Sequence, residues 1–118
     1  AWMRRPWSHA DYMHGYQSYV CCVTPEDAGL ATVGRRYDQR NAMMAALEVE
    51  GITTRQGTHA PPHLHWYRDR YGYTPADFPV AYAAEQLSLT LPLYAGMTED
   101  EQTHVVERLQ HHAHLVGF

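Results

Sequence analysis

The fold is decided by the stretch from Val80 to Gln102, which reads VAYAAEQLSLTLPLYAGMTEDEQ. Its first part, as far as Leu87, places apolar residues at the three- and four-residue spacing of a helix with one buried side. From Leu87 to Leu93 every second residue is leucine, which is the period of a strand with one buried face. The acidic run Thr98-Glu99-Asp100-Glu101 then has the spacing of a capping box. The stretch therefore predicts a helix, a strand and a final helix in that order.

Earlier parts of the chain add strands and helices in alternation. The expected elements are a strand from Tyr16 to Val23, a helix from Tyr37 to Val49, a strand from Ile52 to Arg55, and a helix from Pro61 or Pro62 to Gly72. Asp77 is expected to cap the helix that contains Val80. We therefore predict an α+β domain, with a three-stranded, mainly antiparallel sheet covered by helices on one face.

The chain of 118 residues fits one domain. Residues 15–118 are expected to form it, and residues 1–14, which show no clear period, are interpreted as an arm or linker. With 45% hydrophobic and 19% charged residues, the composition is that of an ordinary globular protein. No apolar run approaches the length of a bilayer span, so we expect no contact with a membrane.

Charge and cysteine content exclude further classes of function. The nine cationic side chains are all arginines, scattered along the chain and outnumbered by thirteen carboxylates, so a nucleic-acid partner is not expected. Cys21 and Cys22 are adjacent in a predicted strand, where they point to opposite faces, so we expect neither a mutual disulfide nor a zinc pair. With no secretory signal in the chain as given, these thiols favour a reducing cytoplasm.

Nine histidines raise the alternative of a metal-binding protein. His59, His63 and His65 lie close together in sequence, and imidazole is a good zinc ligand. However, two prolines separate His59 from His63, so their four-residue spacing is not that of one continuous helix. His63 and His65 are two residues apart and face different directions on a helix. We therefore expect no specific metal site, either here or in the group from His111 to His114.

The loop after the strand from Ile52 to Arg55 carries the candidate binding residues. Arg55 and His59 lie four residues apart on a segment that runs toward a helix start, which suits an anion or a sugar hydroxyl. The alternative is that Arg55 forms a surface ion pair and that the backbone satisfies His59. The sequence contains no Ser-His-Asp order, phosphate-binding glycine loop or paired-carboxylate motif that would indicate a catalytic residue.

Several of these segments together resemble a known family. They are Gly51 to Arg55, Thr58 to His63, Tyr67 to Gly72, Asp77 to Ala81, Leu87 to Tyr94 and Met97 to Gln102. In this order and spacing they are similar to the carboxy-terminal segment of DegT/DnrJ/StrS-type aminotransferases. Members of that family use pyridoxal phosphate to aminate keto groups on nucleotide-linked sugars. The resemblance extends from about Tyr12 to the end of the chain.

The resemblance implies a small domain that packs on a large cofactor-binding domain, or on a second copy through the same face to give a dimer. It also implies that the loop from Thr58 to His63 approaches the active-site cleft. His59 is then the first candidate for contact with a nucleotide-sugar substrate, followed by Arg55 and His63. The residues that bind the cofactor in the family belong to the large domain.

The absence of lysine limits what the chain can do alone. Transamination needs a lysine amine to hold pyridoxal phosphate as an imine, and a guanidinium cannot replace it. We therefore expect the chain to bind no cofactor covalently and to have no activity unless it is joined to a large domain. The alternatives are a free-standing binding or oligomerisation module derived from this domain, and a His-rich metal-binding protein.

Overall fold

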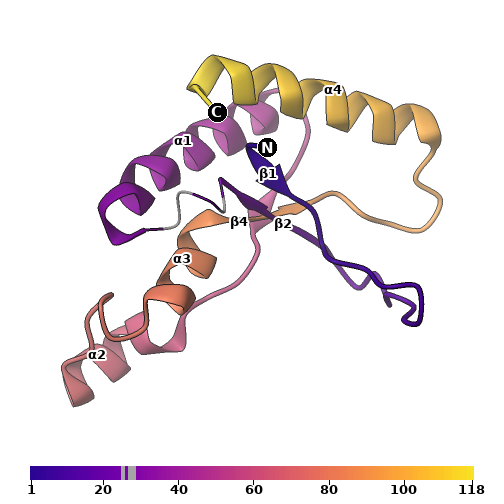
Figure 1. Ribbon diagram of the computed structural model, residues 1–118. Coiled ribbons are helices and arrows are strands. Elements are labelled where there is room, and N and C mark those ends of the chain that lie inside the picture. The colour runs from indigo at the N-terminus through magenta and orange to yellow at the C-terminus, as the bar shows by residue number, and fades with distance from the viewer. Residues whose placement is uncertain (25, 27–28) are drawn as a thin grey trace.

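A four-stranded sheet lies at the centre of the molecule (Figure 1). The computed structural model describes residues 1–24, 26 and 29–118. The strands are β1 (Met3–Arg4), β2 (Tyr19–Val23), β3 (Arg55–Gln56) and β4 (Ser88–Leu91). The helices are α1 (Leu30–Val49), the short 3₁₀ helix η2 (Pro61–His63), α2 (His65–Tyr71), α3 (Pro79–Leu87) and α4 (Glu99–Val116). The strand order is β1-β2-β4-β3, and every neighbouring pair is antiparallel.

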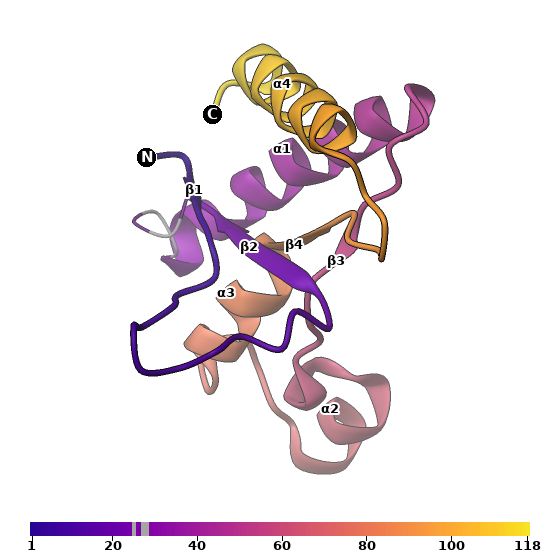
Figure 2. The same cartoon turned by 90° about the vertical axis from the view of Figure 1, so that its right-hand side faces the viewer.

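Helices α1 and α3 lie behind the sheet, and α4 runs alongside α1 (Figure 2). The two views agree that α2 lies farthest from α4, beyond the end of α3. Within the described residues, no helix is long and apolar enough to cross a membrane. The core joins β2 and β4 to α1, α3 and α4, and its buried members are Val23, Val33, Met43, Leu47, Ile52, Ala83, Leu87, Leu89, Val105, Leu109 and Ala113.

The predicted α+β class is confirmed, but the predicted number of three strands is wrong. The fourth strand, β1, comes from the segment 1–14, where Met3 pairs with Val23 and Arg4 with Cys22. The Trp2 ring also stacks on Phe118, with 5.5 Å between ring centroids. A two-residue strand is too short to show an alternation of apolar and polar residues. The sequence therefore gives no indication that β1 pairs with β2.

Several predicted boundaries differ from the structure. The strand expected from Tyr16 begins at Tyr19, and the leucine strand is limited to Ser88–Leu91. The helix expected from Tyr37 begins seven residues earlier, at Leu30, because the polar turn before Tyr37 weakens the apolar period without stopping the helix. The strand expected from Ile52 to Arg55 is shifted to Arg55–Gln56. Ile52 instead closes the end of α1, where its N–H donates to the carbonyl of Leu47 at 2.9 Å.

The sequence predicts a side-chain cap for the final helix and for the helix that contains Val80, and the structure confirms only the first. The capping box at Thr98 is confirmed: Thr98 Oγ1 accepts from the Glu101 N–H, and Glu101 accepts from the Thr98 N–H at 2.8 Å. The expected cap at Asp77 is wrong, because its carboxylate accepts from the N–H and the hydroxyl of Thr74. Asp77 therefore closes the turn before α3 and does not cap the helix itself.

The two cysteines are free thiols on β2. Cys21 is buried opposite Leu89, whereas Cys22 is partly buried opposite Ser88. Burial raises the pKa of the Cys21 thiol to about 11. Because the thiolate is the reactive form, Cys21 is a packing residue and not a nucleophile at neutral pH.

An ion-pair cluster joins the end of α1 to α4. Arg108 donates from Nε and an Nη atom to the two carboxylate oxygens of Glu50, each at 2.6 Å. His112 Nε2 lies 3.0 Å from Glu50 Oε1. Hydrogen bonds from Arg108, and then from His112, lower the pKa of Glu50 to about 2. The carboxylate at the end of α1 is therefore shared by an arginine and a histidine of α4.

Replacing Glu50 is expected to make stability less dependent on pH. The folded-state pKa of Glu50 lies below its unfolded value of about 4.3. Its stabilising contribution is therefore fully present above pH 4.3 and is lost as the pH falls toward 2. Urea unfolding should show Glu50→Gln to be less stable than the parent at pH 7, by a margin that narrows below pH 4. A margin that stays constant down to pH 3 would contradict this cluster.

Gly57, which follows β3, lies unusually close to the sheet. A Cβ built at Gly57 would clash with Val20 Cγ1 and would lie 2.8 Å from Ser88 Cβ. The backbone of the loop can therefore approach β2 and β4 only because residue 57 has no side chain. Gly34, on the exposed side of α1, offers a contrast, because a Cβ at that position would meet nothing within 4 Å.

Alanine should have opposite effects at these two glycines. Gly57→Ala is expected to lower the free energy of unfolding by about 1–3 kcal/mol, the usual cost of overpacking. Gly34→Ala should raise it by up to about 1 kcal/mol, because alanine is the better helix former. Chemical denaturation of both variants checks this. Equal stability of Gly57→Ala and the parent protein would show that the loop does not pack as described.

Candidate functional site

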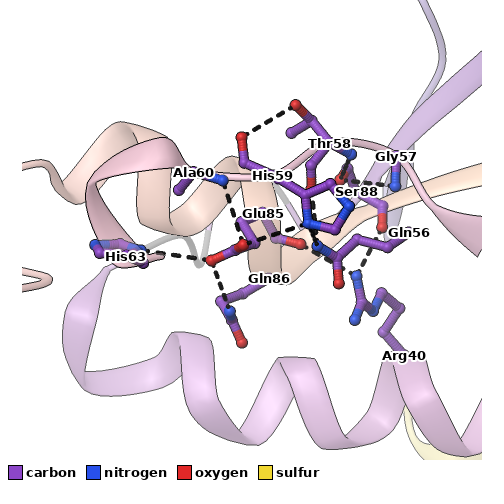
Figure 3. Close-up of polar contacts among 10 residues, drawn as sticks. All are labelled: Arg40, Gln56, Gly57, Thr58, His59, Ala60, His63, Glu85, Gln86 and Ser88. Carbon is purple, nitrogen blue, oxygen red and sulfur yellow. Dashed lines mark hydrogen bonds and ion pairs between the residues drawn. The ribbon is translucent and has the colours of Figure 1, made fainter. Parts of the chain in front are cut away.

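The candidate loop, residues 57–63, leaves β3 and passes over the junction between α3 and β4 (Figure 3). Ser88, the first residue of β4, fixes its start. Ser88 Oγ accepts from the N–H groups of Gly57 and Thr58, each at 3.1 Å. The leucine alternation puts Ser88 on the side of β4 opposite the buried leucines, yet it is 5% exposed because the loop covers it. The expectation of a single buried face is therefore wrong at this position.

Glu85, in the last turn of α3, fixes the middle and the end of the loop. Its Oε1 accepts from the Ala60 N–H at 3.2 Å, and its Oε2 lies 3.4 Å from His63 Nδ1. His59 Nδ1 is 3.8 Å from Glu85 Oε1. The Glu85 side chain is 14% exposed. Two imidazoles and a backbone amide thus converge on one mostly buried carboxylate (Figure 3).

His59 combines a fixed backbone with an open side chain. The backbone on both sides is held, by Ser88 before it and by Glu85 after it. Its side chain is 74% exposed, and Nδ1 lies 3.2 Å from Gln56 Nε2. Most of the ring is therefore free to meet a ligand, as donor or acceptor according to its tautomer.

His63 is enclosed where His59 is open. Its side chain is 10% exposed and packs edge-on against the Tyr82 ring at 4.9 Å between centroids. His63 Nε2 is buried and has no hydrogen-bond partner among the residues that the structure describes. Pro61 opens the 3₁₀ helix that carries this residue, in place of the continuous helix that the sequence predicted.

Arg55 does not join this cluster. It pairs with Thr90 across β3 and β4, and its side chain is exposed. It lines a separate hollow of about 540 Å³ together with Thr90, Pro92 and Tyr94. Of the three candidate residues, the structure brings His59 and His63 to one carboxylate and leaves Arg55 on a neighbouring surface.

A buried arginine lies beneath the site. Arg40 of α1 is 2% exposed, and one Nη atom donates to the carbonyls of Glu85 at 3.2 Å and Ser88 at 2.9 Å. Its other donors reach Asn41 Oδ1, and its guanidinium lies over the Tyr37 ring. Burial lowers the pKa of Arg40. The guanidinium supplies donors to the carbonyls at the end of α3, where a cation also suits the helix dipole.

The histidines do not assemble a metal centre within the described part of the chain. No three His, Cys, Asp or Glu side chains there are arranged to hold an ion. His59 and His63 share Glu85, while His112 contacts Glu50 on the other side of the molecule. The geometry gives the metal-binding alternative no support.

Sequence reasoning missed Arg40, Glu85 and Ser88. Glu85 lies between Ala84 and Leu87 of the apolar stripe, so a carboxylate near the buried side of α3 was the available signal. Arg40 likewise falls within the apolar repeat of α1, three residues before Met43. Ser88 carries no such signal, because its burial depends on a loop that arrives from a distant part of the chain.

Comparison with known proteins agrees with this architecture. Residues 27–110 match the DegT/DnrJ/EryC1/StrS aminotransferase family. The spore coat polysaccharide biosynthesis protein SpsC of Bacillus subtilis is 32% identical over 106 residues, which cover 89% of this chain and 25% of SpsC. The uncharacterized protein MJ1066 of Methanocaldococcus jannaschii is 39% identical over 83 residues, 69% of this chain and 21% of that protein. The chain thus spans about a quarter of the length of these relatives.

Solved structures show the same fold at lower identity. The proposed sugar aminotransferase Spr1654 of Streptococcus pneumoniae, in its PLP form, matches with a TM-score of 0.79 and 20% identity over 100% of this chain and 28% of its own. Helicobacter pylori PseC, an aminotransferase involved in the biosynthesis of pseudoaminic acid, matches with a TM-score of 0.67 and 10% identity over 83% of this chain and 24% of its own. With the match over residues 27–110, the chain belongs to the DegT/DnrJ/EryC1/StrS aminotransferase family.

Proposed function

We propose that residues 15–118 are the small domain of a pyridoxal-phosphate-dependent sugar aminotransferase and form the substrate-side wall of its active site. The family membership supports the reaction class, and the quarter-length coverage of the relatives supports a role as one part of a larger enzyme. Within this domain we assign substrate contact to His59, with His63 and Arg55 as neighbouring positions. The substrate class is a nucleotide-linked keto sugar.

The observation that carries the assignment is a loop whose backbone is hydrogen-bonded on both sides of an exposed imidazole. Three backbone N–H groups, at Gly57, Thr58 and Ala60, are bonded to side chains of the α3–β4 junction. A binding residue works best when its backbone is already fixed, because less freedom is lost when the ligand arrives. The open ring of His59 can donate to or accept from a sugar hydroxyl, and it can donate to a phosphate oxygen.

The cofactor does not fit on this chain alone. No side chain can hold pyridoxal phosphate as an imine, because the 118 residues include no lysine. We therefore assign the cofactor and the catalytic lysine to a large domain, and we assign no catalytic residue here. The role left to this chain is to bind and orient the sugar, and to exclude water from one side of the cleft.

The surface beside the loop is suited to contact with that large domain. A hollow of about 670 Å³ lies between β2, α3 and the segment that follows β1. Thr58 of the loop also lines it, together with Arg4, Arg5 and the apolar side chains of Trp7, Val20, Pro79 and Val80. An exposed hollow of this composition supports a docking role. In the isolated chain we expect the same face to be covered by a second copy.

Substitution of His59 tests the assigned contact. In the full-length enzyme that carries a large domain, His59→Ala should lower kcat/KM for a nucleotide-linked keto sugar roughly tenfold, the value of one hydrogen bond at the upper end of the usual range. Its thermal stability should be unchanged, because the ring is exposed. His114→Ala, which removes an exposed imidazole of α4, serves as the control. Equal kinetics in the two variants would remove His59 from the site.

Self-association of the 118-residue chain tests the docking face. Sedimentation should show a concentration-dependent dimer, and Val80→Arg should weaken it roughly tenfold, because it replaces an apolar contact by a cation on a face that already carries Arg4 and Arg5. Val49→Arg places the same side chain at an exposed valine on the end of α1 and should have no effect. A strictly monomeric chain at high concentration would contradict the proposed face.

A further inference from the structure

The backbone of Glu85 is fixed from inside the molecule. Its carbonyl accepts from the buried guanidinium of Arg40, which also holds the carbonyl of Ser88. Because Arg40 is on α1, the end of α3 cannot shift without disturbing the core on that side. The Glu85 side chain therefore extends toward the loop from a position that the core determines.

The two carboxylate oxygens of Glu85 have different partners. Oε1 accepts from the Ala60 N–H, whereas Oε2 faces His63 Nδ1 and accepts from Gln86 Nε2 at 3.5 Å (Figure 3). An ionised carboxylate can only accept hydrogen bonds, so His63 must carry its proton on Nδ1. His63 Nε2 is buried and has no hydrogen-bond partner among the described residues.

Hydrogen bonds hold the backbone on both sides of His59. Ser88 fixes the loop one residue before it, and Glu85 fixes the loop one residue after it. Glu85 Oε1 also lies 3.8 Å from His59 Nδ1, so the same oxygen acts on the ring and on the neighbouring amide. The edge contact with Tyr82 holds the His63 ring on its other side. One carboxylate thus fixes the end of the loop and the His63 ring, while the nearer partner of His59 Nδ1 is Gln56 Nε2 at 3.2 Å.

We propose that Glu85 is the positioning residue of the substrate loop: it fixes Ala60 and the Nδ1–H tautomer of His63, and thereby presents His59 to the sugar. The proposal rests on the proposed function for its catalytic consequence, but its structural part can be tested alone. Glu85 does not touch the reacting atoms. Its effect on turnover passes through the geometry of the loop.

Two substitutions of Glu85 distinguish the roles of its two carboxylate oxygens. Glu85→Gln keeps one acceptor for the Ala60 N–H but places an amide donor beside His63, so the ring should change to the Nε2–H tautomer. Glu85→Ala removes both partners. In the 118-residue chain, nitrogen NMR of His63 at about pH 8, above the ordinary histidine pKa of about 6.5, reports the tautomer. Amide hydrogen exchange reports the bond at Ala60.

The expected pattern is specific to each variant. Glu85→Gln should switch the His63 tautomer with little change in exchange at Ala60. Glu85→Ala should accelerate exchange at Ala60 roughly tenfold, the loss of one hydrogen bond. Glu48→Ala, at an exposed carboxylate of α1, should leave both signals unchanged. Unchanged signals in Glu85→Gln and Glu85→Ala would overturn the positioning role.

Turnover of the full-length enzyme separates this proposal from the function on which it rests. If the loop is loosened as expected, Glu85→Ala should lower kcat/KM about as much as His59→Ala, roughly tenfold. The double variant should add little, because both changes act on one contact. A loosened loop with unaltered kcat/KM would overturn the proposed substrate contact of the loop. The structural role of Glu85 in positioning the loop would still hold.

Discussion

The buried guanidinium of Arg40 joins α1 to the junction of α3 and β4, from which the candidate loop is held. A buried charge is tolerated only when its hydrogen bonds are satisfied, and here the carbonyls at the end of α3 and the Asn41 side chain satisfy it. The same bonds satisfy carbonyls that the end of a helix would otherwise leave without donors. From this junction Glu85 and Ser88 reach outward to the loop. The conformation of the surface loop is thus fixed, through Glu85 and Ser88, by a buried residue of α1.

The sequence predicts the elements that repeat over many residues. The leucine strand, the apolar stripes of α3 and α4 and the capping box at Thr98 are present, and the α+β class follows from them. Short strands and boundaries are less predictable, because β1 and β3 each pair over two residues and depend on neighbours from elsewhere in the chain. The pairing of Met3 with Val23 arises from tertiary contact, which no local pattern encodes.

In the candidate site, too, the sequence indicates some residues, and others are found only from the folded structure. His59 and His63 could be chosen from the sequence because they lie on a polar loop between a predicted strand and helix. Their shared partner, Glu85, lies 22 residues beyond His63, and only the folded chain brings the three together. Arg55 lies only four residues before His59 in the sequence, yet strand geometry directs it to another surface. Spacing along the chain identifies candidate residues, while the sheet decides which of them meet.

We propose that a chain built in this way provides one wall of a site and leaves the chemistry to another domain. The intact mass of the native polypeptide in its source cell tests this most directly. We predict a protein several times heavier than the 13.5 kDa of these residues, with a lysine-bearing domain in the same chain. A native mass of 13.5 kDa would contradict the account, and the chain would then be a free-standing module whose hollow beside the loop binds a separate partner.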